Sequence, residues 1–269
     1  MPRTSDSTPG DRAPQENWST VRVDRVRTPR IQKATMSTIP VHLPLPTEIR
    51  RRWTALALIQ HAIGLGDDMI SMHRTPFSTV WTFDDDGGGN WAQLTCLDDG
   101  RAAICGNDHE SSERQFLPQW PEAEVPVQVA GVPEWWIDSL SEISSRARPV
   151  GFVYGFDDSG WRRASYAHDD GAEYLLESAT SDAVTIREAV EALDLAFQDV
   201  IDDLAEEAID DEDWAEPEYT PELGALTALV AAGAAATVDM VRAACSPVPC
   251  AEDSVVEALE GFGGTEVLR

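Results

Sequence analysis

The chain has 269 residues, 42% of them hydrophobic and 25% charged, which is enough to bury a substantial core in one large domain or two small ones. It carries 20 basic and 48 acidic residues, a formal net charge of −28, and this argues against nucleic acid as a ligand because phosphate binding needs a basic surface. The N-terminus has no apolar signal-peptide core, no stretch reaches the ~18 uninterrupted apolar residues of a membrane helix, and four cysteines fit a reducing compartment, so we expect a cytoplasmic protein that does not bind membranes.

Residues 1–35 differ in charge from the rest of the chain. They contain seven basic and four acidic residues, a net charge of +3, whereas the remaining 234 residues carry −31. Their Pro, Ser and Arg content without a sustained apolar period predicts disorder. This basic extension either touches the acidic body or precedes a natural start at Met36. We expect an α+β domain over residues 36–180 and an acidic helical region over 181–269, packed on the same domain.

Thr47–Ile63 is the first predicted helix. Pro46 precedes it, and apolar residues recur at helical spacing, including Ile49, Trp53 and Leu56. Gly64 then ends the helical pattern.

Residues 77–107 are predicted to form an antiparallel meander, because three runs rich in β-branched and apolar residues are separated by two Asp/Gly turns. A hairpin loop at Asp98–Gly100 pairs Cys96 with Ala102 and Leu94 with Ile104. In this register one face is apolar: Ala92, Leu94, Cys96, Ala102 and Ile104. The other is polar and expected to face solvent: Gln93, Thr95, Arg101 and Asn107.

A second meander is predicted over residues 150–178. The loop Asp169–Gly171 pairs Tyr166 with Tyr174 and places Arg163 opposite Glu177, as a cross-strand ion pair. The two meanders share motif positions: Phe83 with Phe156, Trp91 with Trp161, and Gly100 with Gly171. They are either an internal repeat or two hairpins that use the same turn residues. A repeat would need a bulge, since the spacing otherwise puts the two tryptophans on opposite faces.

Four further helices are predicted: Glu134–Arg146, Ile186–Ile209, Leu223–Ala244 and Glu252–Glu260. Thr185 and Glu188 have the spacing of a capping box at the start of the longest one. The order of helix, meander, helix, meander and C-terminal helices indicates an α+β fold, with either one sheet or two and the long helix packed across it.

Asp108, His109 and Glu110 are the candidate catalytic residues. A histidine between two carboxylates can act as a general base or bind a divalent metal. Consecutive side chains of an extended chain point in opposite directions, so His61, His73 or His168 would have to complete such a site. The Asp/Gly-rich loop at 84–90 lacks the ligand spacing of a calcium loop, and the cysteines do not form a zinc pattern, so we predict no metal or cofactor.

The acidic side of the long helix is the candidate partner-binding surface. Its residues are Asp199, Asp203 and Glu206, with Trp214 in the following loop. Acidity with aromatic anchors suits a basic protein partner. In general character, with no motif behind it, the chain resembles bacterial immunity or antidote proteins, which neutralise toxins by occlusion. The leading hypothesis is therefore a non-enzymatic interaction protein. The alternatives are an enzyme centred on His109, or a structural or regulatory module whose acidity is common to its host's proteins.

Overall fold

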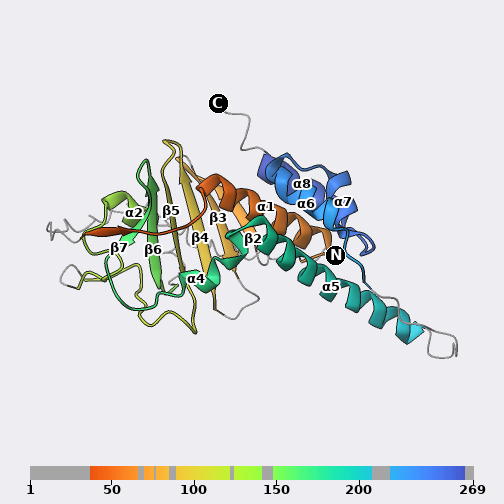
Figure 1. Ribbon diagram of the computed structural model, residues 1–269, viewed down its shortest axis with the longest axis horizontal. Helices are drawn as coiled ribbons and strands as arrows, with labels where there is room; N and C mark the ends of the chain where they lie inside the picture. The colour runs from red at the N-terminus through yellow and green to blue at the C-terminus, as the bar shows by residue number, and fades with distance from the viewer. Residues whose placement is uncertain are drawn as a thin grey trace, which may run out of the picture. The chain divides into compact units, whose positions relative to one another are not determined.

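The computed structural model describes residues 37–65, 70–75, 77–84, 89–121, 124–140, 148–207 and 219–263. In this part of the chain, seven strands form one antiparallel sheet (Figure 1). The strand order is β1-β7-β6-β5-β4-β3-β2. The strands are β1 Thr38–Pro40, β2 Ile70–Arg74, β3 Ser78–Asp84, β4 Trp91–Leu97, β5 Ala102–Asn107, β6 Phe152–Asp157 and β7 Gly160–Ala164. These residues belong to the unit Gln32–Arg269; the predicted extension over 1–35 lies outside the described residues.

The first predicted meander is confirmed in its strands and in its register. Strands β3, β4 and β5 pair in succession, with Cys96 opposite Ala102 and Leu94 opposite Ile104. The loop closes where the Leu97 N–H donates to the Arg101 carbonyl over 2.8 Å, and Gly100 has the left-handed φ of 86° that a glycine allows. Strand β5 also pairs with β6, so the two predicted meanders join in a single sheet.

The second predicted meander is wrong in its third strand. Only β6 and β7 form, and the run that follows them is helical: α4 Ala172–Leu175 and the 3-10 turn η1 Glu177–Ala179. Gly171, with a left-handed φ of 77°, begins a helix here in place of a hairpin, and Leu175 and Leu176 of the helical run are both buried in the main core. The free edge of β7 pairs with β1 instead.

The predicted ion pair between Arg163 and Glu177 is also wrong. The guanidinium of Arg163 lies over the ring of Tyr166, 4.2 Å from its centroid. Glu177 accepts a hydrogen bond of 3.0 Å from Arg187. Because α4 turns the chain away from β7, Glu177 does not lie opposite Arg163.

Both faces of the sheet are covered. The main core lies on one face and includes Leu94, Ile104 and Trp161. The opposite face, predicted to be wet, is buried at Gln93, Thr95 and Asn107. The connection after β5 and the short helix α2 Glu134–Asp138 place a second core over it, with these members: Trp91, Val129, Val132, Trp136 and Leu140.

Trp91 and Trp161 consequently lie on opposite faces of the sheet. An internal repeat would make these two positions equivalent. Gly100 closes a hairpin, whereas Gly171 precedes the helix α4. The structure therefore favours two hairpins that share turn residues over a structural repeat.

The helix α1, Pro46–Ala62, is the element around which the other helices gather (Figure 1). It packs on the sheet through β2, β3 and β4, and on its other sides against α5, α6, α7 and α8. These are α5 Asp182–Glu207, α6 Leu223–Ala232, α7 Val238–Cys245 and α8 Glu252–Gly263. The expectation that the long helix would cross the sheet is corrected: α1 occupies that position and α5 packs on α1 and α6.

Two helix boundaries differ from the predictions for physical reasons. Helix α5 begins at Asp182, so Thr185 lies inside it and donates to the carbonyls of Ser178 and Ser181 over 2.8 and 2.9 Å instead of forming the predicted cap. The predicted helix Leu223–Ala244 is broken at Gly233, which has a φ of 51° and whose backbone lies against Arg51. Of the predicted helix Glu134–Arg146, residues 141–146 lie outside the described residues.

Candidate functional site

Asp108 uses its carboxylate to hold a tight turn after β5. The carboxylate oxygen Oδ1 accepts hydrogen bonds from the main-chain N–H groups of Glu110 and Ser111, over 3.0 and 2.8 Å. The hydroxyl of Ser112 accepts from the Asp108 N–H over 3.1 Å. Asp108 is buried, so its contacts are those of a residue that caps a turn.

His109 and Glu110 project from the same turn. The Nδ1 of His109 lies 3.0 Å from Oδ1 of Asn90, and because that oxygen only accepts, Nδ1 donates to it and Nε2 is left as the basic nitrogen of the ring. Nε2 lies 3.9 Å from Oε1 of Glu110, and the two side chains are 48% and 81% exposed. The structure thus brings His109 together with Asn90 and Glu110, and directs the Asp108 carboxylate elsewhere.

Two of the histidines expected to complete this site contact other residues instead. Nδ1 of His61 lies 3.0 Å from the hydroxyl of Ser254, and His168 stacks on Tyr166 with ring centroids 4.5 Å apart. Among the residues with described positions, no group of three or more His, Cys, Asp or Glu side chains could hold a metal ion.

A buried carboxylate that the sequence interpretation missed lies beside this turn. Oδ2 of Asp170 accepts hydrogen bonds from the hydroxyls of both Tyr154 and Tyr166, over 2.7 and 2.6 Å, while Oδ1 accepts from the Ala172 N–H over 3.2 Å. Burial raises the pKa of both tyrosines well above the usual value, and the negative charge of Asp170 raises it further. At neutral pH both phenols are therefore neutral hydrogen-bond donors to one carboxylate.

This Asp170 cluster connects three parts of the fold. Tyr154 belongs to β6, Tyr166 follows β7, and Ser112 of the Asp108 turn donates to the Asp170 carbonyl over 2.8 Å. Burial, and then the positive charge of Arg114, lowers the pKa of His168, whose Nε2 is buried and has no hydrogen-bond partner among the described residues. The sequence Asp169-Asp170-Gly171 is typical of a hairpin loop. That Asp170 instead accepts hydrogen bonds inside the fold becomes visible only from the position of Tyr154, 16 residues earlier.

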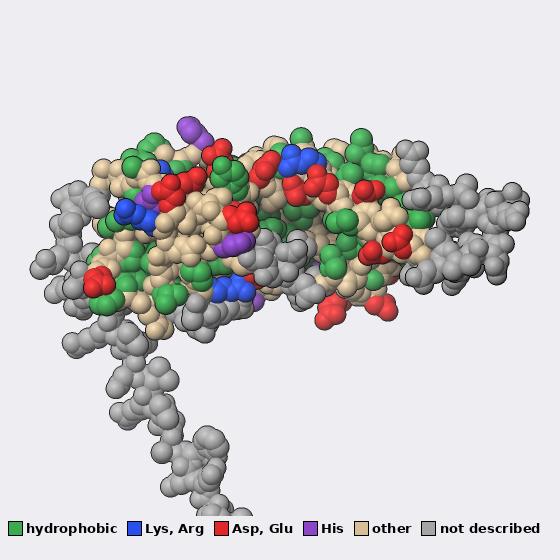
Figure 2. Space-filling model, turned by 90° about the horizontal axis from the view of Figure 1, so that it is seen from below, with side chains coloured by type: hydrophobic (Ala, Val, Ile, Leu, Met, Phe, Trp, Pro, Cys, Tyr) green, Lys and Arg blue, Asp and Glu red, His purple; other side chains and the backbone are tan. Residues whose placement is uncertain are grey.

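Helix α5 presents an acidic face to solvent. One side of the helix packs into the main core through Leu193, Phe197 and Ile201. The side turned away from this core carries six exposed residues: Glu191, Asp194, Leu195, Gln198, Asp199 and Asp202. We call these six residues the α5 acidic face. Figure 2 shows acidic side chains on the half of the molecule that contains α5.

The predicted partner-binding residues fall on or beyond this helix. Asp199 is exposed on the α5 acidic face. The backbones of Asp203 and Glu206 lie in α5, but their side chains are outside the described residues, as is Trp214. The one basic residue of α5 is Arg187, which is bound to Glu177 and Glu188 over 3.0 and 2.8 Å. Nε of Arg187 also lies 3.7 Å from Oε1 of Glu191, so it offsets the first carboxylate of the face, and α5 has no basic residue to offset the others.

Comparisons with other proteins found no relative of this chain. The chain matches no family model, and neither the curated proteins nor the solved structures gave a match. Within the described ranges, no helix combines the length and the apolar character needed to cross a bilayer. Any function must therefore be argued from the geometry of the chain itself.

Proposed function

We propose that this chain is a cytoplasmic, bacterial interaction protein that binds a basic protein partner through the α5 acidic face, in the manner of an antidote that occludes its target. The observation that carries the proposal is Leu195, which is 71% exposed in the middle of that face. An exposed leucine surrounded by carboxylates offers an apolar contact within a polar rim, which is the arrangement of a protein interface.

The two kinds of side chain have separate roles in this proposal. Carboxylates such as Asp199 attract and orient a basic surface, which raises the association rate and makes it sensitive to salt. Leu195 supplies apolar area that is removed from water in the complex, which slows dissociation.

The face is held on a rigid support. Phe197, on the opposite side of α5, packs in the main core. At the start of the helix, Asp182 accepts hydrogen bonds of 2.6 and 2.7 Å from Arg51 and Arg52 of α1. A preorganised surface loses less conformational entropy on binding, so this support favours recognition through α5.

Affinity capture with the full-length chain tests the proposal. The tagged protein is incubated with a lysate of its host at moderate salt, and bound proteins are identified by mass spectrometry. We expect one stoichiometric basic partner that is released at high salt. The variant Asp199→Lys/Asp203→Lys/Glu206→Lys reverses one carboxylate of the face and two acidic residues that follow it in α5, and it should lose the partner. Leu195→Ser should shorten the lifetime of the complex.

A matched control separates this surface from bulk charge. Asp253, Glu257 and Glu260 are exposed on α8, and their combined reversal to Lys changes the net charge by the same amount. Retention of the partner by this control supports the α5 acidic face. Equal loss in both variants would contradict it and would favour acidity as a general property of the host's proteins.

An enzyme or metal site at His109 is the second candidate, favoured by the basic Nε2 that faces solvent 3.9 Å from Glu110. It predicts stoichiometric binding of a divalent metal such as Zn²⁺, measured by calorimetry on the full-length chain. Binding should be lost in His109→Ala and kept in His42→Ala, a change at another exposed histidine. Absence of heat from Zn²⁺ would refute the metal version.

A further inference from the structure

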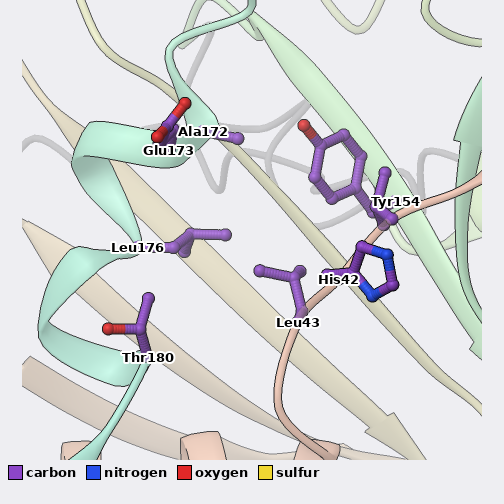
Figure 3. Close-up of a pocket in the computed structure, with 8 residues that line it drawn as sticks. His42, Leu43, Tyr154, Ala172, Glu173, Leu176 and Thr180 are labelled. Carbon is purple, nitrogen blue, oxygen red and sulfur yellow. The ribbon is translucent and has the colours of Figure 1, made fainter.

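A cavity of about 340 Å³ lies where three separate segments of the chain meet (Figure 3). The link between β1 and α1 contributes Val41 and Leu43, strand β6 contributes Tyr154, and the α4–η1 region contributes Leu176. Figure 3 shows the ring of Tyr154 and the side chain of Leu43 directed toward the helical segment across this space. The residues that line the cavity include none of the α5 acidic face, and they do not include His109.

The floor of the cavity is apolar and belongs to the main core. Leu176 and Tyr154 are buried members of that core, and Val41 and Leu43 pack against it. The Tyr154 hydroxyl is already bound to Asp170 over 2.7 Å. What Tyr154 offers to an occupant is therefore its ring, and the floor suits an apolar or aromatic group.

The rim of the cavity carries a negative charge. Glu173 lies at the rim with an exposed carboxylate, and among the described residues it forms no ion pair. Arg52, which donates to the Thr180 carbonyl over 3.5 Å, is paired with Asp182. The nearest arginines to Glu173 along the chain also have other partners. Arg163 donates to the Tyr166 carbonyl over 3.2 Å, and Arg187 is bound to Glu177. This rim therefore favours a cation over a neutral or anionic group of the same size.

We propose that this cavity binds a small amphipathic organic cation, with an aromatic or branched aliphatic group over Tyr154 and Leu176 and an ammonium group beside Glu173. The proposal does not depend on a protein partner at α5, so each can fail without the other.

Two probes that share a phenylethyl group, one cationic and one neutral, test the proposal. The full-length chain is titrated with 2-phenylethylamine, which is a cation at neutral pH, and with the neutral 2-phenylethanol. Binding is followed through the methyl resonances of Val41, Leu43 and Leu176. We expect both probes to shift these methyls, and the amine to bind about two- to fivefold more tightly at low salt, which is the range of an exposed ion pair.

Substitutions then assign the effect to the rim and the mouth. Glu173→Gln should abolish the preference for the amine and leave the alcohol unchanged. Glu257→Gln, on the exposed side of α8, should preserve it. Thr180, which is exposed at the rim, offers a second variant that leaves the core intact: Thr180→Phe should narrow the mouth and weaken both probes at least tenfold, with an unchanged circular dichroism spectrum.

The proposal is overturned by any of four results. These are unshifted methyls with both probes, equal affinity for the two probes, an amine preference that survives Glu173→Gln, and binding that is unchanged in a folded Thr180→Phe variant.

Discussion

The indole ring of Trp136 lies directly against the backbone of Gly155, so closely that a Cβ at residue 155 would overlap the ring atoms Cε2 and Nε1. Gly155 is in the middle of β6, and Trp136 is a buried residue of α2. This contact fixes how the second core sits on the sheet. A rigid ring against a strand has little room to move, since interiors are close-packed.

Gly155→Ala should therefore lower the free energy of unfolding by about 1–3 kcal/mol, the usual effect of inserting a methyl group into a packed core. Urea denaturation measures this change. The second core should loosen selectively, with faster hydrogen exchange in β5 and β6 than in α1.

Gly224 provides the control for this substitution. It is exposed in α6, and a Cβ there would meet nothing within 4 Å. Gly224→Ala should leave stability unchanged or raise it by up to about 1 kcal/mol, because alanine loses less backbone entropy on folding. A destabilisation equal to that of Gly155→Ala would mean that the contact with Trp136 is not the cause.

The Asp170 cluster predicts a loss of stability at alkaline pH. Burial and then the charge of Asp170 raise the pKa of Tyr154 and Tyr166 in the folded state. Above about pH 10 the unfolded chain releases these two protons and the folded chain keeps them, so the free energy of unfolding falls as pH rises. Urea titrations between about pH 8 and 11 measure the slope. It should become shallower in Tyr154→Phe and in Tyr166→Phe.

Tyr174 is the matched control for these phenols, because it is 61% exposed. Tyr174→Phe should leave the alkaline slope unchanged. If Tyr154→Phe and Tyr174→Phe had the same slope as the unchanged chain, the shared carboxylate would not couple folding to these protons.

Asp182 connects the start of α5 to α1 through hydrogen bonds. Its substitution should lower the free energy of unfolding more than the substitution of a surface ion-pair partner. Its carboxylate accepts hydrogen bonds from both Arg51 and Arg52, and only 9% of the Arg52 side chain is exposed. Asp182→Asn removes the charge that faces this buried guanidinium, so we expect a loss of about 1–3 kcal/mol. Asp239→Asn removes a partner of Arg242, whose side chain is 48% exposed, and should change stability by less than about 1 kcal/mol.

The same carboxylate should contribute to acid sensitivity. Burial opposes the ionisation of Asp182, but the hydrogen bonds from Arg51 and Arg52 outweigh it and hold its pKa below the usual value. The stabilisation is therefore complete above the ordinary carboxylate pKa of about 4 and is lost as pH falls through the lower folded pKa. Asp182→Asn should flatten this part of a stability–pH curve. An unchanged curve would assign the acid sensitivity to other groups.

The parts of the fold that could be predicted from the sequence are those with local signals. The loop at Gly100 and the alternation around it determine the pairing of Cys96 with Ala102, because a slip of one residue would reverse the faces. The helix α1 was predicted to within one residue at each end because Pro46 marks its start and apolar residues recur along it. Strand β1 was missed because three residues are too few to show a period.

The remaining features depend on contacts between distant segments. The polar face of the first meander was expected to be wet, but Gln93 and Thr95 are covered by residues that follow β5. The turn at Asp108 was found as a motif, yet the partner of His109 is Asn90, 19 residues earlier across a hairpin. Side-chain chemistry alone does not reveal such partners, because tertiary packing decides which groups meet.

Glu206 lies in the last turn of α5, where the sequence has no basic residue. A negative charge at the C-terminal end of a helix opposes the helix dipole, so Glu206→Gln should raise the free energy of unfolding by about 0.3–1 kcal/mol. Asp253 lies in the first turn of α8, and there Asp253→Asn should lower stability by a similar amount because the sign of the dipole is reversed. Thermal unfolding of the two variants at low salt checks both signs. Glu206 follows the α5 acidic face by four residues along the same helix. If the proposed partner extends over this end of α5, the stabilised Glu206→Gln variant should bind it more weakly, and Asp253→Asn should bind it unchanged. A Glu206→Gln variant that is less stable would show that the acidic end of α5 is needed by the fold itself, which would remove the reason to assign it to a partner.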